Sequence, residues 1–397
     1  MIELPSELRA ALDDALAPYP PRTLAEAADA LSATYRRATT SASRQPARGQ
    51  DRPTSDVVDD AIEASSPPPA QPMTALVVAA YAATRLPATI AAIAAALTQA
   101  RVRRPDWRPQ SLLDAGAGTG AALWATLAVW PDLARATLLE RDPQMIALGK
   151  QLATTTSATS HADWRQGDLR DSRLWDGVTS PERAQPRNKT DRASVSTGEG
   201  YDLVTAAYVL SELRAAEREA LVARLWGATG GALAIVSPGT PIGFAHIRAA
   251  RAQLIAAGAT ILAPCPHDGV CPMGAAGPLV APQPGHFSAP EDWCHFAQRL
   301  ARSRLHRQIK GGDLAYEDEK FSYVIAVRPA NAAVAAVAPT APIGGRIVRH
   351  PQTRPGLVAL ELCAPGGLER RVITRKDRDA YRQARDLRWG DATPPMP

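Results

Sequence analysis

Four cysteines are the residues of this chain whose type and spacing most clearly suggest metal chemistry. They are Cys265, Cys271, Cys294 and Cys363, and the first two each precede a proline. Four soft thiolates suit either a [4Fe–4S] cluster or structural zinc, and Cys-Pro is familiar at iron–sulfur ligands. The spacing differs from the Cys-x-x-Cys pair of zinc ribbons, which favours the iron–sulfur interpretation.

Two alternatives stay open for these cysteines. Buried or free thiols that bind no metal fit the spacing about as well as a metal site does. His267 and His295 could also replace a thiolate as ligands, although histidines beside cysteines more often lie next to a ligand or on the surface.

A glycine-rich loop is the second candidate site. Gly116, Gly118 and Gly120 follow an apolar segment that contains Asp114. Glycines at this place let the backbone approach a ligand beside a helix N-terminus. Glu140 ends the next apolar segment, where a carboxylate can accept hydrogen bonds from both hydroxyls of a ribose. The loop therefore predicts a nucleotide-type binding site.

S-adenosylmethionine is the favoured ligand of this loop. Gly116-x-Gly118-x-x-Ala121 also satisfies the dinucleotide pattern. However, the position of the third glycine, the acid Asp114 before the loop and Asp168, placed to meet an adenine, favour S-adenosylmethionine. A glycine turn that only serves helix–strand packing is the alternative.

No catalytic residue follows from these patterns, because methyl transfer can proceed largely by positioning an activated sulfonium. Amine methyltransferases often carry an Asn/Asp-Pro-Pro-Tyr loop after the fourth strand, and residues 206–212 lack it. Tyr208 in this segment is expected to pack rather than to face a ligand. The methyl acceptor is therefore undefined, and a site without activity is an alternative.

Two basic runs suggest contact with RNA. The first is expected to spread over one broad helical face and comprises Arg299, Arg302, Arg304, Arg307 and Lys310. In the second, basic residues outnumber acidic ones over positions 369–388. Such clusters can follow a phosphate backbone, and a solvated helix face is the alternative.

The elements that position these residues alternate between strand and helix from residue 111 onward, which predicts a mostly parallel sheet covered on both faces. Strands are expected at 111–115, 136–140, near 167–168, 201–207, 232–236, 260–262 and 321–327. Helices are expected at 2–37, 74–101 with a break at Pro87, 121–130, 142–153, 211–226 and up to about 257.

Length and composition agree with a multidomain globular protein. The 397 residues predict two to three domains, and the net charge of +5 allows an RNA partner without requiring one. Four cysteines exclude a disulfide-stapled secreted scaffold. We expect a cytoplasmic protein without a membrane partner, because no signal peptide, transit peptide or apolar segment of spanning length is visible.

Several motifs together resemble one family. They are Pro264–Pro272, Asp292–Phe296, Tyr316–Tyr323, Gly344–Ile347, Leu362–Cys363 and Ala384–Asp391, with Leu4–Pro5 and Arg85–Thr89. These segments resemble the methyltransferase-like family of the mitochondrial ribosomal small subunit, which has bacterial members. The resemblance covers nearly the whole chain apart from residues 38–72 and 176–200.

The resemblance implies an α/β class I S-adenosylmethionine-dependent methyltransferase fold, Rossmann-like. Residues 1–105 would form a helical region with a linker at 38–72. Residues 106–330 would form the methyltransferase-like domain with a polar insertion at 176–200 and a cysteine insertion at 264–320. Residues 331–397 would be a small β-rich extension.

The resemblance also implies a [4Fe–4S] cluster held by Cys265, Cys271, Cys294 and Cys363, with zinc as the alternative. The partner would be the small ribosomal subunit with its rRNA, during methylation or assembly, and the free protein is expected to be a monomer. Two alternatives to a methyltransferase acting on this subunit stay open. One is a non-catalytic RNA-binding assembly factor with a vestigial pocket, and the other is a small-molecule methyltransferase with structural zinc.

Overall fold

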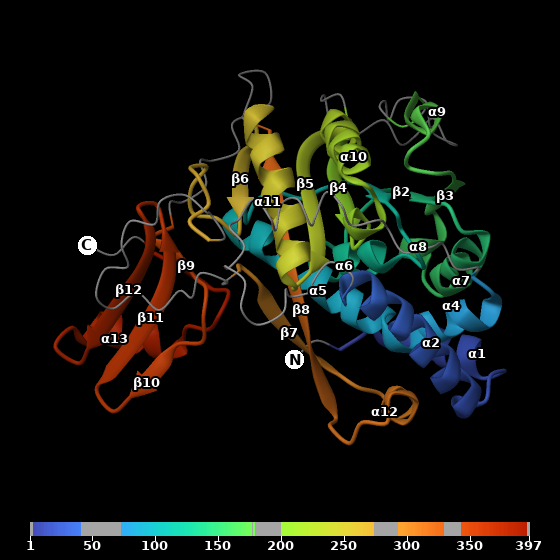
Figure 1. Cartoon of the computed structure of the whole chain (residues 1–397), viewed down its shortest axis with the longest axis horizontal. Helices are drawn as coiled ribbons and strands as arrows, with labels where there is room; N and C mark the ends of the chain where they lie inside the picture. Colours follow the sequence, from blue (N-terminus) through green and yellow to red (C-terminus); the bar gives the residue numbers. More distant parts are fainter. Residues whose placement is uncertain are drawn as a thin grey trace, which may run out of the picture.

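The computed structural model describes residues 3–40, 73–176, 178, 200–273, 293–328 and 343–394. The predicted segments 38–72 and 176–200 lie largely outside the described residues, as do residues 274–292 of the predicted cysteine insertion. The described chain forms a large sheet covered by helices and a smaller sheet beside it (Figure 1).

The large sheet contains β1 (Ser111–Ala115), β2 (Arg135–Glu140), β3 (Asp163–Gln166), β4 (Tyr201–Ala207), β5 (Thr229–Pro238), β6 (Thr260–Ala263), β7 (Phe296–Ala301) and β8 (Tyr316–Val327). The small sheet contains β9 (Gly345–Ile347), β10 (Gln352–Arg354), β11 (Leu357–Ala364), β12 (Gly367–Thr374) and β13 (Ala392–Thr393).

The helices are α1 (Ser6–Leu16), α2 (Pro21–Thr40), α4 (Ala75–Thr84), α5 (Leu86–Arg103), α6 (Ala121–Val129), α7 (Pro143–Ala153), α8 (Ser157–Ser160), α9 (Ser172–Asp176), α10 (Ala215–Ala228), α11 (Pro241–Ala256), α12 (Arg304–Lys310) and α13 (Arg378–Asp386). A short 3-10 helix, η3 (Leu210–Glu212), precedes α10.

The strand order of the large sheet is β3-β2-β1-β4-β5-β8-β6, with β7 paired to β8. Strands β1 to β5 pair in parallel, and β8 runs antiparallel to β5, β6 and β7. An antiparallel strand inserted between β5 and β6 of a doubly wound sheet is the arrangement of class I methyltransferases. The predicted fold class is therefore confirmed.

Helices cover both faces of this sheet, which explains why every residue of β1 is buried. One core contains residues of α5 and α6, including Leu97 and Leu123. The opposite core contains residues of α10 and α11, including Leu225 and Leu254. All four are almost completely buried, and each such side chain contributes about 1.5–3 kcal/mol of hydrophobic stabilisation.

The N-terminal helical region differs in detail from the prediction. The expected helix at 2–37 is divided into α1 and α2 by residues 17–20, because prolines at 18 and 20 interrupt the hydrogen-bond ladder. The break within 74–101 falls at Arg85, between α4 and α5. Among the described residues, no single helix is long and apolar enough to cross a membrane, although α4 and α5 pass that test together as a pair bent by 49°.

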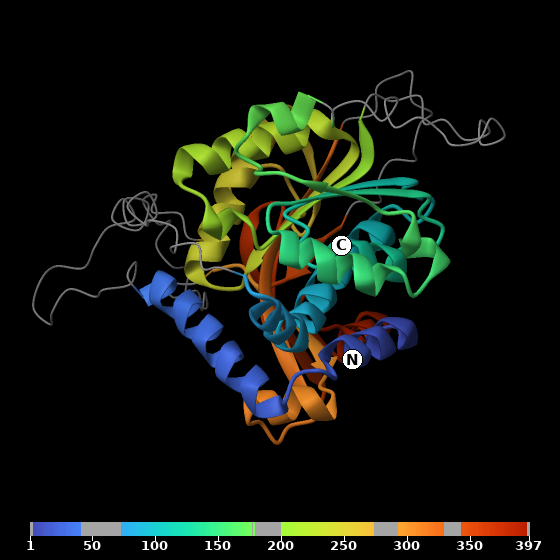
Figure 2. The same ribbon diagram turned by 90° about the vertical axis from the view of Figure 1, so that its right-hand side faces the viewer.

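The first basic run does not form the continuous helix that was expected. Phe296–Ala301 is strand β7, and the helix α12 begins only at Arg304. The strand is favoured because Phe296 and Leu300 lie on one face and are buried, while Ala297 and Arg299 alternate with them and are exposed. β7 and β8 form a long hairpin whose tip carries α12 beside α2, as Figure 2 shows.

The C-terminal segment forms a separate lobe, as the prediction of a β-rich extension required. Its sheet has the order β10-β11-β9-β13, with β12 paired to β11. Ile347, Val358 and Leu360 form its small core together with Ala384 of α13. The lobe lies beside the β6 end of the large sheet, next to α11 (Figure 1).

Candidate functional site

The glycine loop lies between β1 and α6, where the first parallel strand ends. Gly116, Gly118 and Gly120 all have positive φ, which L side chains rarely adopt. A Cβ at Gly116 would lie 2.8 Å from Cγ2 of Val209, so the loop after β4 packs directly on the glycine loop. The sequence therefore needs glycine here both for conformation and for space.

Glu140 faces this loop from the end of β2. Its Oε2 accepts a hydrogen bond of 2.8 Å from the Gly118 N–H, and its Oε1 accepts from the Arg141 and Asp142 N–H groups. The carboxylate is thus held beside the loop by the backbone, at the place predicted for contact with a ribose. Asp142 caps α7, the helix that was expected at 142–153.

The two aspartates predicted for the same site lie in different environments. Asp114 is buried and accepts a 2.8 Å hydrogen bond from Thr205 Oγ1, and burial raises its pKa to about 7. Asp168 lies beyond β3 in a partly exposed turn, where a hydrogen bond from Arg170 lowers its pKa to about 2. Asp114 therefore supports the loop from within the core, whereas Asp168 is an ionised carboxylate near the sheet edge.

A half-buried polar cluster beside the glycine loop was not predicted. Tyr208 is the only non-glycine residue with positive φ among the described residues. Its hydroxyl donates a 2.9 Å hydrogen bond to Oε1 of Glu319, which lies 3.8 Å from Arg85 Nη2. Burial raises the pKa of the Tyr208 phenol well above 10, so it acts as a hydrogen-bond donor. Tyr81 of α4 covers Gly118 on the same side.

The sequence held a partial signal for this cluster. Arg85 and Glu319 belong to two of the motifs that carry the family resemblance, 234 positions apart in sequence. Tyr208, in contrast, was expected only to pack. A backbone strained into the left-handed region and a long-range hydrogen bond cannot be read from residue types.

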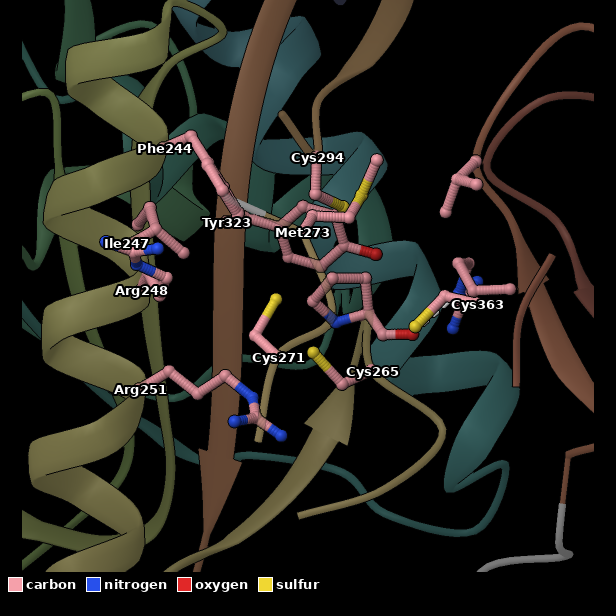
Figure 3. A pocket seen from close by; sticks show the side chains of 13 residues that line it. Phe244, Ile247, Arg248, Arg251, Cys265, Cys271, Met273, Cys294, Tyr323 and Cys363 are labelled. Carbon is pink, nitrogen blue, oxygen red and sulfur yellow. Dashed lines mark hydrogen bonds between the residues drawn. The ribbon is translucent and has the colours of Figure 1, made fainter. Parts of the chain in front are cut away.

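The structure brings all four cysteines to one pocket between the large sheet and the C-terminal lobe (Figure 3). Cys265 and Cys271 come from the segment after β6, Cys294 precedes β7, and Cys363 lies on β11. Side chains of α11 and Tyr323 of β8 complete the walls. The pocket thus joins three segments that are far apart in sequence.

Burial and mutual proximity make the thiols of Cys265, Cys294 and Cys363 reluctant to ionise without a cation. Burial raises the pKa of Cys294 well above 9, and the charges of the other three cysteines raise it further. Burial likewise raises the pKa of Cys363 to about 12, reinforced by Cys265 and Cys271. Because metal ligation requires thiolates, binding of a metal here would release protons and relieve this repulsion.

The two histidines considered as ligands lie differently. His267 Nε2 is 3.8 Å from Cys363 Sγ, so this imidazole lies beside a thiol. His295 does not line the pocket; it stacks on Trp293 and contacts the edge of Trp389 in the C-terminal lobe. Within the described ranges, no group of three or more His, Cys, Asp or Glu side chains is arranged to hold a single metal ion.

Two buried arginines also line the cysteine pocket. No role was predicted for either, although Arg346 lies within Gly344–Ile347, one of the motifs that carry the family resemblance. Arg251 of α11 donates to the carbonyl oxygens of His267 and Gly269 at 2.7 and 2.9 Å. Arg346 of β9 donates to the Pro264 carbonyl oxygen at 2.8 Å. Both guanidinium groups therefore hold the cysteine-bearing segment by its backbone.

Acids neutralise part of the predicted RNA-binding run. Arg299 pairs with Asp318 at 2.8 Å, and Arg302 and Lys310 both reach Glu317, at 2.7 and 2.9 Å. These ion pairs stabilise the hairpin. Because the cations already pair with carboxylates, they are less suited to bind a phosphate backbone. Arg304 and Arg307 lie on α12, where Arg304 is exposed and Arg307 is half-buried.

The family comparison covers both sites. Residues 75–394 match the family described as "Mitochondrial small ribosomal subunit Rsm22", which is most of the chain. The chain belongs to the Rsm22 family. The match spans β1 with its glycine loop, all four cysteines and the C-terminal lobe, so the predicted family resemblance is confirmed.

Two curated relatives are similar over most of this chain. It is 30% identical over 330 residues to "Ribosome assembly protein METTL17, mitochondrial" of Homo sapiens, covering 79% of this chain and 62% of that protein. It is 27% identical over 356 residues to "Rsm22-cox11 tandem protein 2, mitochondrial" of Schizosaccharomyces pombe, covering 80% and 43%. The Rsm22-family chain thus spans less than two thirds of the length of either relative.

Solved methyltransferases are distantly similar. Magnesium protoporphyrin IX methyltransferase from Synechocystis, bound to S-adenosylhomocysteine, is 13% identical with a TM-score of 0.33, covering 61% of this chain and 82% of that chain. Precorrin-6y C5,15-methyltransferase from Geobacter metallireducens is 13% identical with a TM-score of 0.32, covering 59% and 88%.

Proposed function

We propose that this chain acts in the cytoplasm, as a monomer, in assembly of the small ribosomal subunit, with a [4Fe–4S] cluster in the cysteine pocket and S-adenosylmethionine at the glycine loop. The observation that carries the proposal is the convergence of four cysteines from distant segments within the region matched by the family. The name of the human relative, a ribosome assembly protein, supports the proposed role in ribosome assembly.

The donor set and its surroundings fit an iron–sulfur cluster. Cys265, Cys271, Cys294 and Cys363 would be its ligands, and Phe244 and Ile247 of α11 supply apolar walls. An apolar, cationic enclosure protects such a cluster and tunes its potential. When bound, the cluster would supply a rigid cross-link and one-electron redox chemistry. The protein's part is to hold the thiolates and to exclude water.

Metal analysis after anaerobic purification tests this site directly. We expect about four irons and four sulfides per chain, and a broad visible absorption that disappears when the cysteines are replaced by serine. One zinc without iron would support the alternative of a structural zinc site. Absence of both metals from freshly purified protein would overturn the cluster proposal.

The glycine loop supports S-adenosylmethionine through its backbone and through Glu140. The Gly118 N–H and the Glu140 carboxylate lie together at the carboxyl edge of the sheet, where ligands of this fold class bind. Isothermal titration with S-adenosylmethionine tests binding, with Glu140→Ala as the variant that should lose affinity. A chain that binds NAD but not S-adenosylmethionine would refute the assignment.

Methyl transfer is a separate question from binding. Incubation with small ribosomal subunits and radiolabelled S-adenosylmethionine should label rRNA if the chain is an enzyme. Binding without transfer would favour a non-catalytic assembly factor. The half-buried Tyr208–Glu319 pair, whose donor and acceptor are engaged with each other, is consistent with that candidate.

Contact with rRNA is proposed for the tip of the hairpin and the C-terminal lobe. Arg304 on α12 and the exposed arginines Arg378 and Arg385 on α13 are available for phosphates, whereas Arg382 pairs with Asp379 at 3.4 Å. Affinity for small-subunit rRNA should fall steeply with salt, and Arg378→Glu with Arg385→Glu should weaken it. Unchanged affinity and salt dependence would contradict this surface.

A further inference from the structure

Two cationic side chains are buried in the cysteine pocket without an anionic partner among the described residues. Arg251 is 6% exposed and Arg346 only 1% exposed. Among the described residues, their hydrogen bonds to oxygen all go to uncharged acceptors: the carbonyls of His267, Gly269, Pro264 and Gly390, and the amide oxygen of Gln99. Arg251 also forms a side-chain hydrogen bond with the Cys265 thiol. Buried charge is costly unless it is balanced, so these two arginines need an explanation.

Each guanidinium also keeps one buried N–H without a partner. In the described structure, Nε of Arg251 and Nη2 of Arg346 are enclosed and form no hydrogen bond. Both residues line the same pocket as the thiols. Donors left unsatisfied beside a pocket indicate that a further acceptor is required there.

The two arginines approach the thiols from opposite sides. Arg251 reaches from α11 toward Cys265 and Cys271 (Figure 3). Arg346 is the strand partner of Cys363 between β9 and β11, so both side chains lie on the same face of the small sheet. Both guanidinium groups therefore line the pocket into which the four thiols converge.

We propose that Arg251 and Arg346 are positioning residues for an anionic four-thiolate centre, donating N–H groups to its sulfur atoms and balancing its charge. This inference rests on the proposed presence of a [4Fe–4S] cluster in the same pocket. A [4Fe–4S] core with formal charge 2+ and four thiolates carries two negative charges, which two guanidinium groups neutralise. Net charge and hydrogen bonds to sulfur are among the factors that set the potential of such clusters.

The balance of charge between the cluster and the two guanidinium groups predicts an effect on the reduction potential of the cluster. Reduction adds one electron to the cluster, so a nearby positive charge favours the reduced form. Removing one guanidinium should therefore shift the reduction equilibrium at least tenfold toward the oxidised form. For a one-electron couple this tenfold change corresponds to a midpoint potential about 59 mV lower.

Redox titration of the purified holoprotein, followed by visible and electron paramagnetic resonance spectroscopy, measures this shift. Arg251→Gln is the main variant, because Arg346 also contacts Gln99 and Gly390 and so joins the lobe to α5. Arg251→Lys keeps the charge and should restore most of the potential. Arg346→Lys should do the same relative to Arg346→Gln if the second arginine acts through its charge.

Arg103→Gln is the matched control. This half-buried arginine also donates to a backbone carbonyl, that of Leu262 at the end of β6, but it does not line the pocket. Its loss should shift the equilibrium less than threefold. A shift equal to that of Arg251→Gln would mean that any nearby charge suffices, and the proposed role would be wrong.

The outcomes separate this inference from the proposed function. If the wild-type protein contains no iron, the cluster proposal itself fails. If wild type and both Gln variants hold four irons at the same midpoint potential, the cluster stands and the role of the arginines is refuted. If Arg251→Gln fails to fold, the comparison of Arg346→Gln with Arg346→Lys still decides, because the midpoint potential should fall only in the variant that loses the charge.

Discussion

Replacing Cys363 with serine should uncouple the C-terminal lobe from the large sheet. A cluster ligated by Cys294 and Cys363 closes a chain loop of about 70 residues. Treated as a covalent cross-link, such a loop stabilises the folded state by about 4 kcal/mol through the entropy of the unfolded chain. Because ligand strain and residual structure reduce this value, we expect a loss of about 2–4 kcal/mol.

Hydrogen exchange followed by mass spectrometry measures this loss where it should occur. Amides of β9 and β11 report the opening of the lobe, and amides of β1 and β4 in the large sheet serve as the internal reference. In Cys363→Ser the lobe strands should exchange faster by a factor that corresponds to 2–4 kcal/mol, about 30-fold to 1,000-fold. Exchange in β1 and β4 should change little.

A matched experiment isolates the cross-link from the side chain. After removal of iron with a chelator, wild type and Cys363→Ser should differ by less than about 1 kcal/mol, because only a thiol is then exchanged for a hydroxyl. Equal lobe stability of the two iron-loaded proteins would refute the reasoning. So would a defect of the same size before and after iron removal.

Three further predictions concern other contacts. Glu317→Gln should cost about 1–3 kcal/mol in urea unfolding, because it weakens the acceptor shared by Arg302 and Lys310. Burial tends to raise the pKa of Glu317, but hydrogen bonds from these cations and His306 lower it. This stabilisation is therefore present above about pH 4 and is lost as the pH falls further. An effect of Glu317→Gln that does not depend on pH would contradict this network. Gly116→Ala should lower affinity for S-adenosylmethionine more than about tenfold by calorimetry, because a Cβ meets Val209 at 2.8 Å; retained affinity would show that the loop does not hold the ligand. Asp114→Asn should flatten the pH dependence of thermal stability between about pH 4 and 7, since burial raises the carboxyl pKa to about 7 and the wild type therefore loses stability as the pH rises through this window; an unchanged slope would argue against burial of the charge.

Elements with one dominant pattern were predictable from the sequence. The strands at 111–115 and 201–207 are short apolar runs because both faces of a parallel sheet are covered, and the structure has β1 and β4 at these residues. The loop of Gly116 to Gly120 was predictable because its glycines are required by local backbone conformation. Local sequence carries this information without any tertiary contact.

The elements that the prediction missed depend on tertiary contacts. The arginines of 299–310 are spaced irregularly, so the sequence does not show where a strand ends and a helix begins. Phe296–Ala301 is extended because it pairs with β8. The burial of Arg251 and Arg346 was not predicted, because isolated basic residues are normally exposed. Although Arg346 lies in the family motif Gly344–Ile347, residue types alone do not indicate that a lobe closes over either side chain.

The position of the last ligand, in the C-terminal lobe, has a consequence for how the cysteine pocket forms while the chain is being synthesised. Cys265, Cys271 and Cys294 are synthesised before β9 and β11, which bring Arg346 and Cys363. Translation at roughly 5–20 residues per second separates Cys294 from Cys363 by about 4–14 seconds. During this interval three thiols and a buried arginine face an open side. A nascent chain therefore passes through a stage in which the site is incomplete, and a cluster inserted then would lack its fourth ligand until the lobe folds.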